Sequence, residues 1–335
     1  MNKIEKIYFD HNATTRVDDE VLDAMMPYFQ NRFGNPSSGH NLGIAGRQAI
    51  NQAREQVADS IEAQPSQVVF TSGGSEANNL FIQGVAGHLK NSRIIISAIE
   101  HPCVLRPAKE LAQSTNKECG LRQLIVDRSG RIIMSDVDKA LSEYPPNIVS
   151  VMLANNETGV IQEVANIAEK SRKLDALIHT DAIQAFGKIP VSFPSLNVHA
   201  MTLSSHKIYG PKGAAALIID KEIVLRPQIF GGGHEGGLRS GTENVPAIVG
   251  FGKACELSKL RMEKTTIHVT KLRTHLEKRL IEMGAIIFGM NAARLPNTSY
   301  FALPDIEGET LVIRLERAGF LIASGAACSS AAPGK

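Results

Sequence analysis

An aspartate and a lysine, each close to the end of an apolar run, are the residues that suggest chemistry most directly. Asp181 ends the run 177–181, and Lys207 follows the run 201–205. A lysine held beside hydroxyl groups and a histidine can lose its proton and form a Schiff base with an aldehyde. A carboxylate can keep a pyridine nitrogen protonated, so that the ring withdraws electrons from a bound substrate. Each residue alone fits a solvated loop lysine or a helix-capping aspartate equally well, but the pair favours a pyridine aldehyde cofactor.

Further groups that could bind such a cofactor follow other predicted strands. Gly74 and Ser75 stand where a strand passes into a helix, a place that favours a phosphate, although an ordinary helix cap has the same pattern. His101 follows the run 93–97 and could stack on a ring or move protons; a loop histidine is the alternative. Asn155 follows the run 148–153 and therefore belongs to the carboxyl edge of the sheet, where open α/β sheets bind ligands.

The cysteines indicate free thiols and at most one reactive thiol. Four cysteines, none within metal-finger spacing of another, argue against a disulfide framework and against a structural zinc site. Cys328 lies among small residues, which suggests an exposed loop thiol that could act as a nucleophile; a chance free cysteine is the alternative. Cys103, Cys119 and Cys255 are interpreted as structural. Cys103 is of interest because it is close to His101.

The composition excludes several classes of protein. The chain has 335 residues, 43% apolar and 21% charged, which is typical of a globular protein of about two domains. A net charge of +2 and 5% aromatic residues argue against a nucleic-acid partner. Since no apolar run reaches membrane-spanning length and the N-terminus has no signal-peptide core, we expect a cytoplasmic protein with no membrane partner. The glycines at 231–236 match G-x-G-x-x-G, but no strand–turn–helix order surrounds them, so nucleotide binding is not expected.

Apolar runs of strand length alternate with helical patterns through the first two thirds of the chain. This alternation predicts an α/β protein with a mostly parallel sheet covered on both faces. The expected strands are 68–71, 93–97, 121–126, 148–153, 177–181, 201–205 and 215–220, and the expected helices are 75–90, 104–113, 135–143 and 163–174. A long helical region, 246–284, then precedes strands 297–303 and 320–323 and a helix at 308–318. We expect a large domain, 15–245, and a smaller α+β domain formed by 1–14 and 246–335.

Taken together, these residues resemble the pyridoxal phosphate enzymes of the aspartate-aminotransferase fold type (fold type I), and among them the class-V cysteine desulfurases of iron–sulfur cluster assembly. The matching segments lie in order along nearly the whole chain: 8–15, 34–38, 71–76, 100–102, 155–159, 179–184, 204–213, 231–245 and 324–330. The segment around Cys328 is the most specific, because it is similar to the long-loop subgroup. The resemblance implies pyridoxal 5′-phosphate as the cofactor, L-cysteine as the substrate and L-alanine as a product.

The resemblance also implies roles for single residues. Lys207 holds the cofactor as a Schiff base and moves the substrate α-proton, His101 stacks on the ring and assists proton transfer, and Cys328 takes the sulfur as a persulfide. Asp181 and Gln184 contact the ring nitrogen and the ring hydroxyl. The implied phosphate contacts are Gly74, Ser75, Ser204, His206 and, across a homodimer, Thr242; the implied substrate contacts are Asn12 and Asn155, the latter also a cofactor contact.

The implied partners are a second copy of the chain and a sulfur acceptor, either a cluster scaffold or a tRNA-thiolation relay. No metal site is implied, although Cys328 could transiently ligate a cluster. Two positions, His11 and Arg16, differ from the residues more usual in the family, and we expect little effect. Family members also continue for several dozen residues past the cysteine loop and provide an arginine for the substrate carboxylate, whereas this sequence stops at Lys335. The alternatives are a selenocysteine lyase or another pyridoxal phosphate enzyme of the same fold, and an inactive scaffold.

Overall fold

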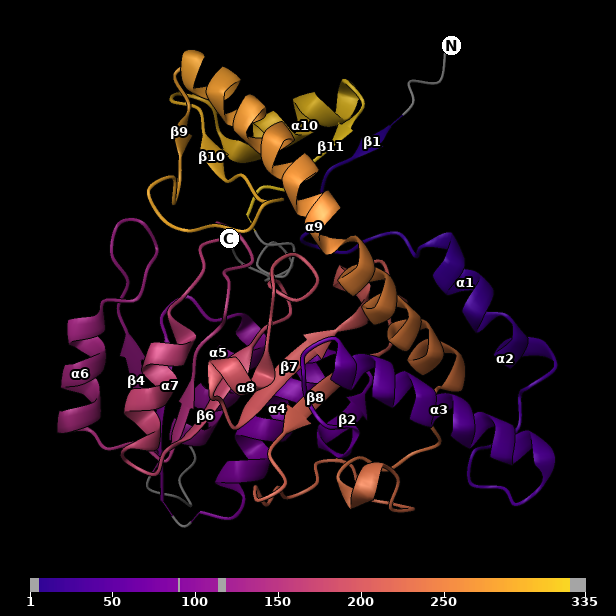
Figure 1. Ribbon diagram of the computed structural model, residues 1–335. Helices are drawn as coiled ribbons and strands as arrows, with labels where there is room; N and C mark the ends of the chain where they lie inside the picture. Colours follow the sequence, from indigo (N-terminus) through magenta and orange to yellow (C-terminus); the bar gives the residue numbers. More distant parts are fainter. Residues whose placement is uncertain (1–5, 90, 114–118, 326–335) are drawn as a thin grey trace.

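The computed structural model describes residues 6–89, 91–113 and 119–325, and a seven-stranded sheet forms its centre (Figure 1). The order across the sheet is β2–β8–β7–β6–β5–β3–β4, and β8 runs antiparallel to both of its neighbours while the other pairs are parallel. The strands are β2 (Val68–Thr71), β3 (Ser92–Ser97), β4 (Cys119–Leu124), β5 (Ile148–Ser150), β6 (Leu177–Asp181), β7 (Ala200–Ser204) and β8 (Ala215–Ile219). The mostly parallel α/β sheet expected from the sequence is confirmed.

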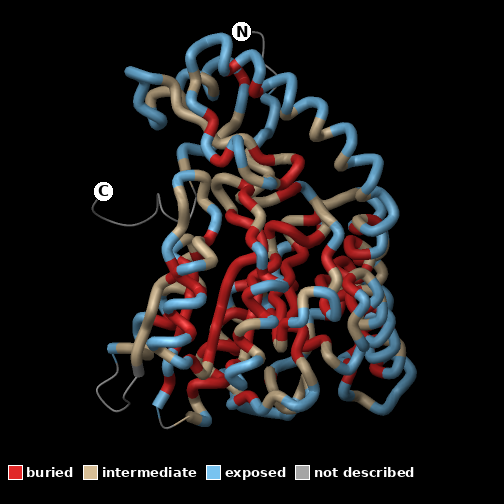
Figure 2. Tube along the Cα trace, turned by 60° about the vertical axis from the view of Figure 1, so that its left-hand side comes forward, coloured by how far each residue is buried: buried red, intermediate tan, exposed pale blue. Residues whose placement is uncertain are grey.

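Helices cover both faces of this sheet, which explains why its strands, apart from the edge strand β4, are buried at nearly every position. In β3, Ile94 and Ile96 belong to the cluster packed with α4 (Gly74–Ala86) and α5 (Pro102–Gln113), whereas Ile95 faces the opposite cluster. Figure 2 shows the buried residues concentrated in this central layer. The other elements of the large body are α6 (Met134–Glu143), α7 (Val164–Arg172), α8 (Phe193–Leu196) and the short 3₁₀ turns η1 (Pro65–Gln67), η2 (Ser205–Lys207) and η3 (Glu235–Gly237).

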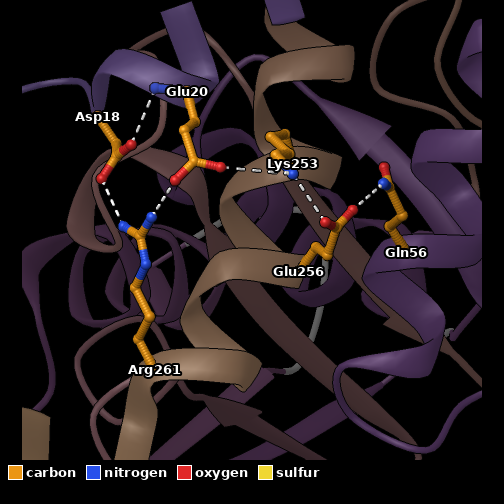
Figure 3. A network of polar contacts seen from close by, with 6 residues as sticks. All are labelled: Asp18, Glu20, Gln56, Lys253, Glu256 and Arg261. Atoms are coloured by element: carbon orange, nitrogen blue, oxygen red, sulfur yellow. Dashed lines mark hydrogen bonds and ion pairs between the residues drawn. The ribbon is translucent and has the colours of Figure 1, made fainter. Parts of the chain in front are cut away.

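Three helices that the sequence analysis did not predict precede the sheet: α1 (Asp19–Met25), α2 (Pro27–Gln30) and α3 (Asn41–Asp59). The long helix α9 (Val245–Glu282) packs against α1 and α3. Contact with α3 is close, because a Cβ added at Gly252 would lie 2.7 Å from the Cα atom of Ala53. A network of exposed ion pairs and hydrogen bonds joins the same three helices through Asp18, Glu20, Gln56, Lys253, Glu256 and Arg261 (Figure 3).

The second half of α9 extends into a smaller body that combines the two ends of the described chain (Figure 1). There β1 (Ile7–Tyr8) pairs in parallel with β11 (Phe320–Leu321), and β9 (Ile286–Ile287) pairs antiparallel with β10 (Phe301–Ala302), beside α10 (Gly308–Arg317). The expected strand 297–303 is wrong in its first half, because Asn297 and Thr298 instead hydrogen-bond the side chain of Asn12. No helix in the described part of the chain is long and apolar enough to cross a membrane.

The smaller body docks on the turn that follows β5. The amide of Ile161 donates to the carbonyl of Ala293, and the amide of Leu295 donates to the carbonyl of Gly159. Gly159 has a φ of +73°, and a Cβ there would lie 2.8 Å from the Cβ atom of Thr298, so both its conformation and its close contact require glycine. This contact holds residues 155–161 against the smaller body.

Candidate functional site

The carboxyl ends of β5, β6 and β7 bring Asn155, Asp181 and Lys207 to one edge of the sheet, as the sequence predicts. Lys207 ends the turn η2 directly after β7. Its Nζ atom donates to the main-chain carbonyl groups of Asn12 and Ala13, the latter at 2.7 Å. The N-terminal segment therefore crosses the sheet edge beside the lysine amine.

Asp181 is buried at the end of β6 and accepts two hydrogen bonds. Nδ2 of Asn78 donates to Oδ2 at 2.8 Å, and the amide of Ile183 donates to Oδ1 at 3.0 Å. Burial raises the pKa of the Asp181 carboxyl, while these hydrogen bonds and the charges of His101 and Lys207 act in the opposite direction. A buried carboxyl of this kind is suited to a positively charged N–H group, which would compensate for its desolvation.

The N-terminus of α4 and the end of β7 have the features of a phosphate site. Ser75 is exposed in the first turn of α4, where unpaired amide groups and the helix dipole favour an anion. The buried hydroxyl of Ser204 has no hydrogen-bond partner among the described residues. A Cβ added at Gly74 would overlap Cδ1 of Ile183, so α4 begins in close contact with the segment after β6.

His206 lies between these groups and the N-terminal segment. Its Nδ1 atom is 3.1 Å from the hydroxyl of Thr14. Burial, followed by the positive charge of Lys207, lowers the pKa of His206 to about 4, so the ring is neutral at physiological pH. A neutral imidazole can still donate one hydrogen bond to an anion.

His101 precedes α5, and its ring accepts from the start of that helix. The amide of Cys103 donates to Nδ1 of His101 at 3.2 Å, and the thiol of Cys103 lies 2.8 Å from the same atom. Burial lowers the pKa of His101 and raises the pKa of Cys103 to about 12. His101 and Asp181 interact electrostatically, so the two predicted ring contacts belong to one site.

Gln184, Lys188 and Asn12 form a second group beside Lys207. Nε2 of Gln184 donates to the carbonyl of Asn12 at 2.9 Å, and Nζ of Lys188 donates to Oε1 of Gln184 at 2.7 Å. Burial, followed by repulsion from Lys207, lowers the pKa of Lys188 to about 7. Lys188 was not predicted from the sequence, where its spacing of four residues from Gln184 was the available signal.

The side chains of Asn12 and Asn155, both predicted to contact substrate, take part in internal hydrogen bonds. Nδ2 of Asn12 donates to Thr298 at 3.0 Å, and its Oδ1 accepts from Asn297 at 3.0 Å. Oδ1 of Asn155 accepts from the amides of Glu157 and Thr158 and from the Thr158 hydroxyl, and thereby shapes the turn after β5. Nδ2 of Asn12 also donates to the carbonyl of Asn156, so this side chain joins the turn after β5 to residues 297–298 of the smaller body.

Two predicted site residues are not brought into this group. Thr242 is exposed in the loop before α9, and Cys328 lies outside the described residues. The same loop is tied to the large body by Arg239, which donates to Glu76 at 2.9 Å, and by Glu235, whose Oε2 accepts from the amide of Phe70 at 2.8 Å. The glycine-rich match 231–236 thus forms a loop with the turn η3, not the strand–turn–helix of a dinucleotide site.

Comparison with known proteins gives a consistent family likeness. The family model for class-V aminotransferases matches residues 7–333. The cysteine desulfurase IscS of Dictyoglomus turgidum is 40% identical over 331 residues, covering 97% of this chain and 82% of that protein. A cysteine desulfurase of Sinorhizobium fredii is 42% identical over 328 residues, covering 97% and 84%.

Solved structures agree with these relatives. A NifS-like protein superposes with a TM-score of 0.91 at 38% identity, covering 95% of this chain and 87% of that chain. The structure of SspA in complex with cysteine superposes with a TM-score of 0.83 at 34% identity, covering 96% and 90%.

Proposed function

Because this chain belongs to the class-V aminotransferase family, we propose that it removes sulfur from L-cysteine and passes it on through a persulfide on Cys328. Cysteine desulfurases that match over 97% of the chain make it an enzyme of this type, which depends on pyridoxal 5′-phosphate. The observation that carries the assignment of the site is the convergence of Lys207, Asp181 and Ser204 at one sheet edge, where the buried Ser204 hydroxyl has no hydrogen-bond partner within the described parts of the chain.

The residues at this edge fit the cofactor. Lys207 is the amine that would hold its aldehyde carbon, and the buried Asp181 would face its ring nitrogen. Ser75, Ser204 and the N-terminus of α4 would receive the phosphate, which would give the buried Ser204 hydroxyl the partner that it lacks. Gln184 would reach the ring hydroxyl and His101 the ring face. Gly74, His206 and Asn155 complete the set of proposed contacts.

Bound pyridoxal phosphate supplies a protonated ring that stabilises negative charge on the carbon next to the substrate amino group. Asp181 would maintain that protonation, because the hydrogen bonds that its buried carboxylate accepts come from the neutral donors of Asn78 and the Ile183 amide. Lys207 carries the α-proton. The Cys328 thiolate attacks the sulfur of L-cysteine, so that an S–S bond forms while the S–C bond breaks. The electron pair of the broken bond stays on carbon, which takes a proton and leaves as L-alanine.

We place the enzyme in the cytoplasm as a homodimer, in which Thr242 reaches the phosphate held by the other subunit. The exposure of Thr242 supports this, because the loop is anchored at Glu76 and Phe70 while Thr242 remains exposed. Sulfur then passes from Cys328 to an acceptor for iron–sulfur cluster assembly or tRNA thiolation.

Product analysis of the purified chain tests this proposal. The chain is incubated with L-cysteine, pyridoxal phosphate and a reductant, and alanine and sulfide are measured for the parent, Cys328→Ser and Lys207→Ala. We expect both products from the parent alone, with the cofactor absorbance retained in Cys328→Ser and lost in Lys207→Ala. Full sulfide release by Cys328→Ser would assign the sulfur to another thiol. A parent that binds the cofactor and releases no alanine would contradict the desulfurase assignment.

A further inference from the structure

Cys103 contacts three of the residues that we assign to the cofactor site, directly or through one neighbour, and the proposed reaction does not use it. Its sulfur lies 2.8 Å from Nδ1 of His101 and 3.0 Å from Nδ2 of Asn78, and the Ser75 side chain also hydrogen-bonds it. Asn78 continues the chain of contacts to Asp181 at 2.8 Å. The thiol therefore links the predicted phosphate end, the ring-nitrogen partner and the ring-face histidine.

The donors in this chain determine where the protons lie. The amide nitrogen of Asn78 can only donate, so the sulfur of Cys103 accepts from it. The single proton of the thiol is then available for Nδ1 of His101. The main-chain amide of Cys103 also donates to that atom, at 3.2 Å. Because both donors converge on Nδ1, this atom uses its lone pair and carries no proton.

The protonation of both groups agrees with this arrangement. Burial lowers the pKa of His101, so its ring is neutral and its one proton is on Nε2. Burial raises the pKa of Cys103, so the sulfur keeps its proton and remains a hydrogen-bond donor. A protonated thiol is a poor nucleophile compared with a thiolate.

We propose that Cys103 is a positioning residue that holds His101 in the Nε2–H tautomer, and that it does not accept sulfur. Any hydrogen bond or proton that His101 gives in the site then comes from Nε2. A neutral Nε2–H ring cannot accept a proton at that nitrogen, which leaves Lys207 to take the α-proton. The inference rests on the proposed function, because the cofactor contact of His101 is part of it.

Nuclear magnetic resonance of the cofactor-free protein tests the tautomer without any turnover. Long-range ¹H–¹⁵N spectra of protein labelled at histidine nitrogens are recorded across pH for the parent, Cys103→Ser and Cys103→Ala, and His101→Gln identifies the signal. We expect the Nε2–H tautomer in the parent and in Cys103→Ser, whose hydroxyl can replace the thiol donor. Cys103→Ala should raise the pKa of His101 by about half to one pH unit, because a donor to Nδ1 stabilises the neutral ring.

An Nδ1–H tautomer in the parent, or an unchanged His101 pKa in Cys103→Ala with a native-like melting temperature, would overturn the positioning role. If Cys103→Ala does not fold, the comparison of the parent with Cys103→Ser still decides the tautomer. Peptide mass spectrometry after L-cysteine treatment of Cys328→Ser tests whether Cys103 accepts sulfur. A persulfide on Cys103 would overturn the proposal that it does not. The tautomer and the desulfurase activity can fail separately. If the spectra are as expected but the parent releases no alanine, the Nε2–H tautomer is supported and the desulfurase proposal is contradicted.

Discussion

At the scale of single residues, Asp181 determines how strongly a bound pyridine ring can withdraw electrons. Its carboxylate accepts from Asn78 and from the amide of Ile183, and both bonds fix its two oxygens. Replacing it by asparagine removes the charge and places one NH₂ group against a donor. We expect Asp181→Asn to keep the cofactor attached to Lys207 and to lower kcat by about a hundredfold or more, the size typical of losing a preorganised charge.

Steady-state alanine production and the absorbance of the bound cofactor check this prediction together. Asp181→Glu is the matched control, since it keeps the charge and changes only its reach, and it should retain more activity than the asparagine variant. Turnover of Asp181→Asn at the parent rate would show that this carboxylate does not control the ring.

At the scale of elements, a polar row crosses the middle of the sheet at His179. Its Nδ1 atom lies 2.8 Å from the Ser150 hydroxyl in β5, its Nε2 atom lies 3.0 Å from the Thr202 hydroxyl in β7, and its ring stacks on Phe81 at 4.8 Å. Burial lowers the pKa of His179 to about 3. An unfolded histidine binds its proton near pH 6.5, so between pH 6.5 and about 3 the unfolded chain holds the extra proton.

Stability should therefore fall as the pH is lowered through this range, with His179 contributing up to about 1.4 kcal/mol per pH unit. His179→Gln keeps polar groups in the row and cannot titrate, so its free energy of unfolding should vary less steeply with pH, whatever its value at pH 7. Urea unfolding of both proteins at pH 7, 6 and 5 measures the difference in slope. Parallel pH curves for the two proteins would contradict the role of His179.

The N-terminus of α4 gives a second prediction at this scale. A Cβ at Gly74 would overlap Cδ1 of Ile183, whereas Gly73 has an extended φ of 176° and open space around its Cβ position. We expect Gly74→Ala to push the helix end away from the phosphate and weaken cofactor binding about tenfold, in line with the cost of modest overpacking. Gly73→Ala is the control and should bind nearly as the parent does. Titration of the two cofactor-free variants with pyridoxal phosphate measures the difference. Equal affinities of Gly74→Ala and Gly73→Ala for the cofactor would contradict the packing argument.

How far the sequence reveals these elements depends on which side chains they bury. The strands of the large sheet were predicted because buried runs such as 94–96 are continuously apolar. The helix α3 was missed, since several of its buried positions are small residues, among them Gly43, Gly46, Ala49 and Ala53, which give little apolar periodicity. Lys207 and Asp181 were predicted from strand ends. Asn12 was expected at the site only from the family resemblance, and Ala13 and Asn78 were not predicted, because no spacing rule places the N-terminal segment or the buried side of α4 beside them.

At the scale of the whole molecule, the site depends on contact between the two bodies. Residues 293–298 leave the smaller body, bond to residues 159 and 161 after β5, and reach Asn12 beside Lys207. A bidentate ion pair fixes this segment to α9: Arg294 donates to Glu277 at 2.8 and 2.9 Å. The two side chains are only 5% and 10% exposed, so the pair is shielded from water.

Breaking this pair from one side should be costly, because it leaves a buried guanidinium without its partner. We expect Glu277→Ala to lower the free energy of unfolding by about 3–5 kcal/mol. The control is Glu316→Ala, which removes an ion pair with Lys6 whose side chains are 54% and 53% exposed; it should cost less than about 1 kcal/mol. Denaturant unfolding followed by circular dichroism measures both values, and similar small losses for the two variants would mean that the buried pair does not hold the bodies together.

The segment that the Arg294–Glu277 pair fixes also supports Asn12. Sulfide release by Glu277→Ala should therefore fall at temperatures well below its unfolding midpoint, whereas release by Glu316→Ala should follow that of the parent.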